Sequence, residues 1–230
     1  MSRIRILFML MLFSACQLEY EDNRRLLISG QVVGFENEEL PAFPIEAYAS
    51  VYADTDLIGT DQSNAKGNYA ITTISAKNSQ NISVYINKEG TYGYQGDRPS
   101  ITLQGVNFLM MEDSKYTIPN RVRMGRLKEV QVKIHRITNQ MDRLEYKILY
   151  NAKMKEISFE PGAEQEGESW QCSKYGELFL EDSIEEQTIY VPEGDSIALQ
   201  YKLVNDDLVK KQQTIVLPYN KTENAYEFEF

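Results

Sequence analysis

Few residues of this chain could carry nucleophilic or metal chemistry. It has one histidine, His135, at a polar position of an alternating strand pattern, and no HExxH motif or second histidine accompanies it. We therefore expect a surface side chain rather than a general base or a ligand. Cys172 has the acidic neighbours Glu164, Glu166 and Glu168, which disfavour a thiolate nucleophile, so we expect a packed or idle thiol. Without a G-x-S-x-G motif, the sequence indicates that the protein is not an enzyme of the nucleophile-histidine kind.

Carboxylates and a glycine-rich loop offer a second set of possibilities. Glycoside hydrolysis needs two carboxylates at a defined separation, but 34 acidic residues make that signal unspecific. Two acidic groups could bind calcium but lack EF-hand spacing, namely Asp54, Asp56 and Asp61, and the pair Asp206 and Asp207. Residues 90–96 (GTYGYQG) lack the Lys-Ser or Lys-Thr of a nucleotide-binding loop. We therefore expect no metal and no cofactor.

Three aromatic side chains in loop-like segments are the candidate binding residues. Tyr92 and Tyr94 alternate with glycines, and Trp170 lies in residues 160–173, which hold four glutamates, two glycines and one proline. Exposed tyrosine and tryptophan rings can stack on sugars or peptides because each joins a flat apolar face to a polar group. The alternative is that all three pack into local cores, as large aromatic side chains usually do.

The first fifteen residues have the layout of an export signal. Two arginines precede an apolar run over residues 6–13, which is too short to span a bilayer. Residues 12–16 (LFSAC) resemble a bacterial lipobox, with Phe13 where that family usually has leucine. The resemblance implies cleavage before Cys16 and lipid on its thiol. An ordinary secretory signal or a buried core helix is the alternative.

The charge of the processed chain limits its partners. Removing residues 1–15 takes away two arginines and no acid, so the formal net charge of −10 becomes −12. Such a chain is poorly suited to nucleic acid or to anionic lipid headgroups. We therefore expect membrane contact through the lipid on Cys16. Cys172 would be the one remaining thiol, so folding would rely on packing without an internal disulfide.

Cys16 is followed by a polar segment, residues 17–25 (QLEYEDNRR), which we expect to be a tether to the first folded element. Its acidic cluster resembles export signals that send some bacterial lipoproteins to the outer surface, and a plain solvated linker is the alternative. We therefore expect a location in the bacterial cell envelope, anchored to the outer membrane, and two orientations stay open, toward the periplasm or at the cell surface.

The first half of the body is typical of an all-β fold, because short β-branched and aromatic runs are separated by Gly, Pro, Asn and Asp. We expect strands over residues 27–34, 45–52, 69–74, 82–87 and 101–109. Gly67 lies where a tight turn needs positive φ. The segments ISGQVV (28–33), IEAYA (45–49), IGTD (58–61) and KGNYAI (66–71) resemble the carboxypeptidase-regulatory-like domain. That resemblance implies a transthyretin-like β-sandwich, which we assign to residues 26–124.

The second half alternates apolar and polar residues more strictly, which indicates half-buried antiparallel strands. The alternation is clearest around Val130, Leu144, Ile197 and Tyr226. We expect a second sandwich, Ig-like or transthyretin-like, over residues 125–230, with the boundary at Met124-Gly125.

Two Asp-Ser-Ile segments, at Ser183 and Ser196, resemble acceptor sites for bacterial O-glycosylation. Asp and Ser at the entrance of a strand explain both segments equally well.

These features favour a non-catalytic, lipid-anchored envelope protein that acts as a binding, adhesion or accessory module. Proteins with a carboxypeptidase-regulatory-like domain often stand beside surface nutrient-uptake or adhesion machinery, so envelope proteins or glycans are the expected partners. One alternative is a fimbrial or surface-fibre subunit, since some lipidated precursors with two transthyretin-like sandwiches are similar. A further alternative is a carboxylate-based glycan hydrolase.

We predict that a Cys16→Ala chain remains unlipidated and largely unprocessed at that site, because the thiol that carries the lipid is gone. Membrane fractionation and mass spectrometry of the N-terminus would measure both effects, with Cys172→Ala as the matched control. A Cys16→Ala chain that fractionates with membranes as the native chain does would contradict the anchor.

Overall fold

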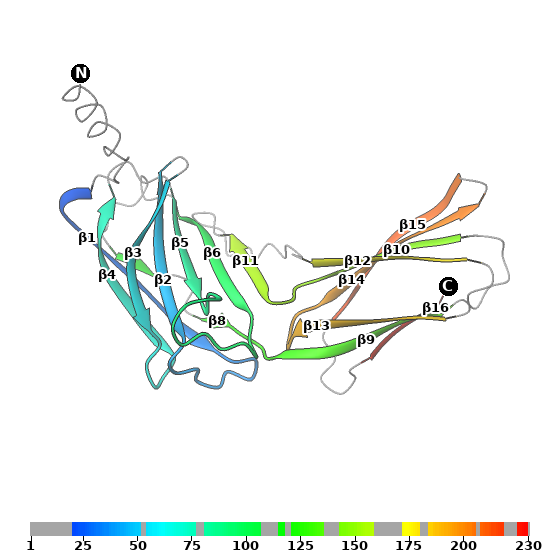
Figure 1. The fold of residues 1–230 in the computed structure, drawn as a ribbon, viewed down its shortest axis with the longest axis horizontal. Coiled ribbons are helices and arrows are strands. Elements are labelled where there is room, and N and C mark those ends of the chain that lie inside the picture. The colour runs from blue at the N-terminus through cyan, green and yellow to red at the C-terminus, as the bar shows by residue number, and fades with distance from the viewer. Residues whose placement is uncertain are drawn as a thin grey trace, which may run out of the picture.

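The computed structural model describes residues 20–51, 54–76, 81–106, 115–117, 121–135, 143–158, 172–179, 184–205, 208–218 and 225–229. Its regular elements there are all strands: β1 (Tyr20–Val33), β2 (Pro44–Val51), β3 (Asp54–Gln62), β4 (Asn68–Ala76), β5 (Asn81–Ile86), β6 (Ser100–Val106), β7 (Lys115–Thr117), β8 (Val122–Arg123), β9 (Leu127–His135), β10 (Arg143–Tyr150), β11 (Met154–Ser158), β12 (Cys172–Leu178), β13 (Ile184–Pro192), β14 (Ile197–Asn205), β15 (Leu208–Leu217) and β16 (Ala225–Glu229). They build two β-sandwiches that follow each other end to end (Figure 1). The expected all-β class with tandem sandwiches is confirmed. Within the described ranges, no helix has the length and apolarity needed to cross a bilayer.

The first sandwich packs two sheets around one core. One sheet has the order β4-β1-β7, with β8 also paired to β1, and the other has the order β11-β6-β5-β2-β3. Alternate residues of β1, β2 and β5 point inward, so that Ile28, Ile45 and Ile86 are fully buried. Strand β1 begins at Tyr20, inside the segment expected to be a tether, where Tyr20 pairs with Ala76 of β4.

The turn into β4 has the conformation expected from its residues. Gly67 has φ of 75°, which confirms the predicted positive φ, and its amide donates to the carbonyl of Asn64 over 2.8 Å. The Asn64 side-chain oxygen accepts from the amides of Lys66 and Asn68. A side chain at Gly67 would collide with the carbonyl oxygen of Val32 as well as straining the backbone.

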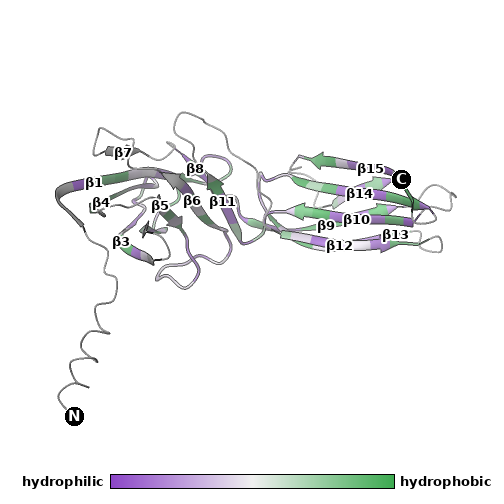
Figure 2. Ribbon diagram, turned by 90° about the horizontal axis from the view of Figure 1, so that it is seen from above, coloured by the Kyte–Doolittle hydropathy of each residue, from purple (hydrophilic) through white to green (hydrophobic). Residues whose placement is uncertain are grey.

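The second sandwich follows the alternation of its sequence. Its sheets have the orders β12-β10-β14-β15 and β13-β9-β16. Val130, Val132 and Ile134 of β9 are buried, as are the alternate residues of β10 and β14, and Figure 2 shows the matching bands of apolar and polar residues along these strands. Strands β14 and β15 pair antiparallel, with Asn205 beside Leu208 at their connected ends.

Strand β11 links the two sandwiches. It follows β10 of the second sandwich in the chain, but it pairs in parallel with β6 of the first, with Ile157 beside Leu103 (Figure 1). Ile157 is buried in the core of the first sandwich. The residue range expected for the second sandwich, 125–230, thus supplies one edge strand to the first.

Each sandwich contains a tyrosine that lies over a glycine on the neighbouring strand. Tyr69 of β4 faces Gly30 of β1, and Tyr146 of β10 faces Gly176 of β12. A Cβ at Gly30 would lie 2.6 Å from the Tyr69 hydroxyl oxygen, and one at Gly176 would collide with the Tyr146 hydroxyl. Only glycine leaves room for these buried rings.

We predict that Gly176→Ala lowers the free energy of unfolding by about 1–3 kcal/mol, because the added methyl group must displace the buried Tyr146 ring. Chemical denaturation would measure the change. The matched control is Gly96→Ala, whose Cβ would meet its nearest neighbour, Tyr94, at an ordinary 3.7 Å. Equal stability of the two variants would show that the Tyr146 ring has another place to pack.

Candidate functional site

The candidate site is the connection between β5 and β6, residues 87–99, which carries Tyr92 and Tyr94. Its first residue, Asn87, is fully buried and has φ of 58°, a left-handed conformation that asparagine tolerates. The side-chain amide nitrogen of Asn87 donates to the carbonyls of Gln95 at 2.9 Å, Arg98 at 3.2 Å and Pro99 at 3.3 Å. Its side-chain oxygen accepts from the Gln95 amide at 2.8 Å. One buried side chain therefore holds both ends of the loop together.

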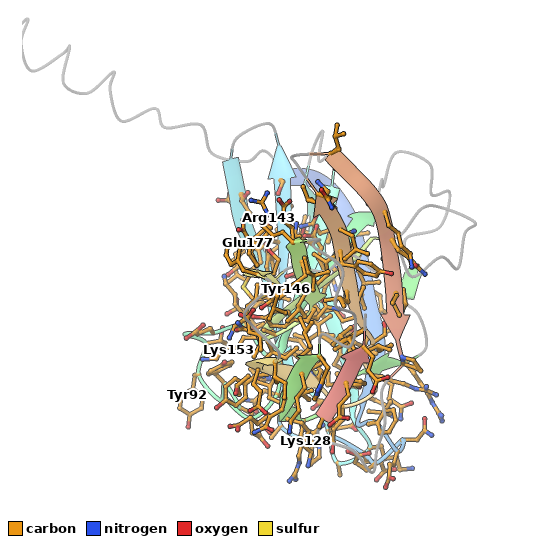
Figure 3. All side chains as sticks on the ribbon, turned by 90° about the vertical axis from the view of Figure 1, so that its right-hand side faces the viewer. Tyr92, Lys128, Arg143, Tyr146, Lys153 and Glu177 are labelled. Atoms are coloured by element: carbon orange, nitrogen blue, oxygen red, sulfur yellow. The ribbon has the colours of Figure 1, made fainter. Side chains whose placement is uncertain are left out.

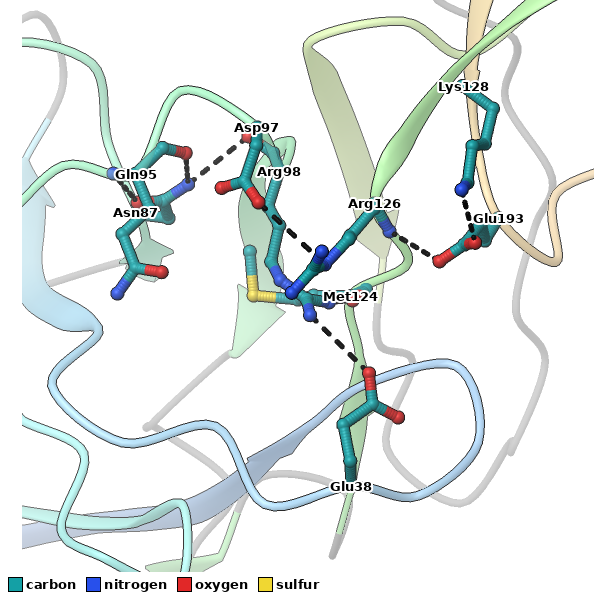
Figure 4. Close-up of polar contacts among 9 residues, drawn as sticks. All are labelled: Glu38, Asn87, Gln95, Asp97, Arg98, Met124, Arg126, Lys128 and Glu193. Carbon is teal, nitrogen blue, oxygen red and sulfur yellow. Dashed lines mark hydrogen bonds and ion pairs between the residues drawn. The ribbon is translucent and has the colours of Figure 1, made fainter.

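Arg98 fixes the second end of the loop to the rest of the first sandwich. Its side chain is buried, and its guanidinium donates to the carbonyl of Met124 and to Glu38, with an Nη2 to Oε1 distance of 3.4 Å (Figure 4). Burial alone would raise the pKa of Glu38, but hydrogen bonds from the backbone amides of Glu38 and Glu36 and the charge of Arg98 outweigh it and lower that pKa. The buried guanidinium is therefore paired with a carboxylate that stays ionised.

The loop projects Tyr92 into solvent. Gly90 and Gly93 flank it with φ of 87° and 89°, conformations that suit glycine. The Tyr92 side chain is 91% exposed and points away from the strands (Figure 3), whereas Tyr94 is half-buried. Burial raises the pKa of Tyr94, and the nearby Glu89 carboxylate raises it further. Of the two tyrosines, Tyr92 is the one that offers its ring to a ligand.

A lysine-tyrosine cluster lies at the start of this loop, on the outward face of β2 and β5. Lys88 Nζ donates to the Tyr48 hydroxyl at 2.7 Å and lies 3.4 Å from a carboxylate oxygen of Glu46. It also lies 4.3 Å from the ring centroid of Tyr48 and 5.1 Å from that of Tyr85. The hydrogen bond with Tyr48 raises the pKa of Lys88 most, burial opposes it, and Glu46 adds to the rise. The cluster therefore keeps a cation among aromatic faces.

Thr91 connects this cluster to the loop. Its hydroxyl donates to the second carboxylate oxygen of Glu46 at 3.1 Å, and its amide donates to the Lys88 carbonyl at 3.2 Å. Tyr48 and Tyr85 meet edge to face with centroids 5.2 Å apart. The cluster was missed from sequence, although the outward parity of Glu46 and Tyr48 in one strand, next to a buried Ala47, was a usable signal.

The loop also touches the junction between the sandwiches. The carbonyl of Asp97 accepts from the amide of Leu127, and its carboxylate lies 3.8 Å from Arg126 Nε (Figure 4). Arg126 in turn exchanges hydrogen bonds with Glu193: the Glu193 amide donates to its carbonyl at 2.9 Å, and its own amide donates to the Glu193 carboxylate at 3.2 Å. The position of the loop is thus tied to the second sandwich.

The other residues considered from sequence form no such cluster. His135 lies on β9, with its Nε2 buried and without a hydrogen-bond partner in the part of the chain that the structure describes. Cys172 is a half-buried free thiol on β12, in a different sheet from β9, and Asp61 accepts from the amide of Ala70 at 2.6 Å. Across the described ranges, no group of three His, Cys, Asp or Glu residues could hold a metal ion.

Several predicted positions fall outside the described residues, and their roles stay predictions. They are Cys16, Trp170, Ser183, Asp206 and Asp207. The second glycosylation candidate, Ser196, is half-buried just ahead of β14.

Comparison with known proteins gives distant structural similarities. No family model and no curated protein matches the chain. A streptococcal ancillary pilin matches with a TM-score of 0.32 and 8% identity over 91% of this chain and 63% of its own, so the chain spans less than two thirds of that pilin. The shaft pilin SpaA from Lactobacillus rhamnosus GG gives 0.32 and 8% over 88% of this chain and 96% of its own. The tip fimbrial protein Mfa3 from Porphyromonas gingivalis gives 0.31 and 8% over 84% and 80%. TM-scores this low support no inference about function.

We predict that Asn87→Gly lowers the free energy of unfolding by about 1–3 kcal/mol, since glycine accepts the positive φ but leaves the Gln95 amide and the loop carbonyls without the Asn87 side chain. Asn87→Ala should cost about 1 kcal/mol more, because alanine adds backbone strain. Chemical denaturation and hydrogen exchange of the Gln95 amide would measure both variants. Native exchange of that amide in Asn87→Gly would contradict the role of the side chain.

Proposed function

We propose that the protein is a non-catalytic module of the bacterial cell envelope, anchored by lipid on Cys16, that binds a glycan through the surface around Tyr92. The observation that carries this proposal is the 91% exposure of Tyr92 on a loop whose two ends are fixed by buried side chains. A large exposed ring on an ordered loop costs little conformational entropy on binding.

The chemistry beside Tyr92 suits a sugar. Its ring offers a flat apolar face of the kind that stacks on a pyranose, and the adjacent Thr91, Glu46 and Lys88 supply donors and acceptors for sugar hydroxyls. The net charge of −10 for the whole chain argues against nucleic acid as the ligand and favours a neutral or basic one.

The architecture supports presentation of this loop away from a membrane. Strand β1 begins at Tyr20, four residues after Cys16, and runs along the first sandwich. After the far end of β1, the chain places Glu38 against Arg98 of the loop. Figure 1 shows the start of β1 and the β5–β6 connection at opposite ends of this sandwich. An anchor ahead of β1 would therefore leave the loop facing outward.

A surface-fibre subunit is the second candidate. The observation in its favour is the interlocked junction, because β11 joins the two sandwiches through main-chain hydrogen bonds with β6. Electron microscopy of cells that carry or lack the gene would test this role, and absence of fibres in both would reject it.

We predict that Tyr92→Ala reduces retention on a glycan panel at least tenfold (about the loss of one stacked aromatic ring), because the exposed ring is removed without disturbing the core. The control is Tyr175→Ala, since Tyr175 is an exposed tyrosine on β12 of the second sandwich. The panel should also be assayed for turnover. Unchanged retention in Tyr92→Ala would reject the surface, and turnover of any glycan would favour the hydrolase alternative over a binding module.

A further inference from the structure

Strand β15 is an open edge of the second sandwich. It spans ten residues, Leu208–Leu217, and pairs with β14 on one side only, among the strands that the structure describes. Figures 1 and 2 show it at the margin of the sandwich. A free strand edge presents a row of unpaired backbone donors and acceptors, which makes it a template for another strand.

Both faces of β15 are open to solvent along most of its length. Among the described strands, its sheet has four and the opposite sheet has three, so β15 extends beyond the opposite sheet. As a result Lys211 and Gln213 are exposed, even though they pair with the core-facing Leu203 and Tyr201 of β14. Apolar side chains remain exposed at the two ends of the strand: Leu208 by 63%, Val209 by 55% and Val216 by 52%.

A bulge in β15 brings the two valines to one face. The register with β14 shifts between Leu203, which pairs with Lys211, and Val204, which pairs with Val209, so that one residue of β15 is left over. Val216 pairs with Ala198, and after the bulge Val209 pairs with Val204. By alternation Ala198 and Val204 lie on the face of β14 opposite Leu199, and both are themselves buried, with 0% and 7% exposure. Leu208 and Leu217 correspondingly pair with Asn205 and Ile197 and share the inward face.

We propose that β15 pairs antiparallel with β15 of a second copy, about a two-fold axis at Gln213. In that register Gln213 lies opposite itself, and Lys211 lies opposite Ile215. The bulge then places Val209 opposite Val216 on the outward face and Leu208 opposite Leu217 on the inward face. Every facing pair comes from the same face of the sheet, as antiparallel pairing requires. Two four-stranded sheets thereby become one continuous sheet.

The pairing brings two lysines from each copy, Lys210 and Lys211, into one sheet, so the separation of their charges matters. Each Lys211 faces an isoleucine, and the two Lys211 residues are four residue steps apart along the strands, or about 14 Å. That separation exceeds the Debye length of about 10 Å at 0.1 M salt. Lys211 Nζ also lies 5.6 Å from the ring centroid of Tyr201 in its own chain, which keeps this charge near its own sheet.

Two other sheet edges are bridged by side chains within the chain, whereas β15 is a longer edge with exposed apolar ends. Lys174 of β12 donates to the carbonyl of Thr188 on β13 at 2.6 Å and so bridges the opposite edge of the same sandwich. In the first sandwich, Thr73 of β4 donates to the carbonyl of Ile58 on β3. A two-fold contact between β15 strands uses the same surface on both copies and therefore closes as a dimer rather than growing into a fibre.

A self-cross-link tests the axis directly. In the full chain with Cys16→Ser and Cys172→Ser, we expect Gln213→Cys to form a disulfide-linked dimer under mild oxidation. Directly opposed residues have Cα atoms about 4.5–5.5 Å apart, within the range of about 4.4–6.8 Å for a disulfide. The matched control is Gln200→Cys, an exposed position on β14, one strand away from the axis. No more cross-linking at position 213 than at position 200 would overturn the proposal.

Sedimentation of the full chain over a range of concentrations tests the apolar pairs. We expect a monomer-dimer equilibrium whose dissociation constant rises at least about tenfold in Val216→Lys, since that change opposes a charge to Val209 of the other copy. Ile74→Lys is the control, because Ile74 of β4 is 51% exposed on the other sandwich. A monomer at every concentration, or an equal effect of both substitutions, would overturn the proposal, and circular dichroism would verify that both variants fold.

Discussion

The return of β11 to the first sandwich is the constraint on which the rest of the molecule depends. Its parallel pairing with β6 satisfies backbone groups of a strand that would otherwise be an isolated connection, and it buries Ile157 in the first core. The chain must therefore leave β10 of the second sandwich at one fixed point. Lys155 and Asn151 meet Asp195 there, with distances of 3.1 and 3.2 Å to its carboxylate oxygens. Relative motion of the sandwiches would break main-chain and side-chain bonds together.

The same junction stabilises the loop that carries Tyr92. In the segment between β8 and β9, the Met124 carbonyl accepts from Arg98, and the Leu127 amide at the start of β9 donates to the Asp97 carbonyl. Its Gly125 approaches Glu193 so closely that a Cβ would collide with the Glu193 backbone, and Gly194 likewise lies against the Phe35 ring of the first sandwich. The β5–β6 loop and the segment between β8 and β9 therefore pack against each other and against the second sandwich. A binding surface built on this packing is presented by both sandwiches rather than by one flexible loop.

Sequence patterns predicted the strands that have one buried and one exposed face, and missed strands without that difference. In β9 and β10 one side is buried, so alternation was clear and the strands were found. Strand β3 (DTDLIGTDQ) carries charged and glycine residues at an edge and was not predicted as a strand. Strand β11 (MKEIS) is too short to show a period, and its partner lies some fifty residues earlier, so no local signal marks it.

The candidate site divides in the same way. The glycines of residues 90–96 marked the loop, because a positive φ at Gly90 and Gly93 follows from residue type. The sequence left open whether the tyrosines between them are exposed, and the fold exposes Tyr92 but half-buries Tyr94. What orders that loop was hidden, since Asn87 and Arg98 act through contacts with residues that only the fold brings near. The contact between Lys88 and Tyr48 was missed for the same reason, because 40 positions of sequence separate the two residues.

The uneven sheets of the second sandwich show how a local constraint leaves a surface open. Strand β16 pairs with β9 in parallel, which ends the smaller sheet at three strands, while the β14–β15 hairpin extends the larger sheet to four. Among the strands that the structure describes, the opposite sheet offers none beyond three to face this fourth strand, and its residues Gln213 and Lys211 are polar where β14 has Tyr201 and Leu203. Lys211 in the middle of this edge discourages indiscriminate pairing, while the apolar residues at both ends supply the contacts of the proposed dimer.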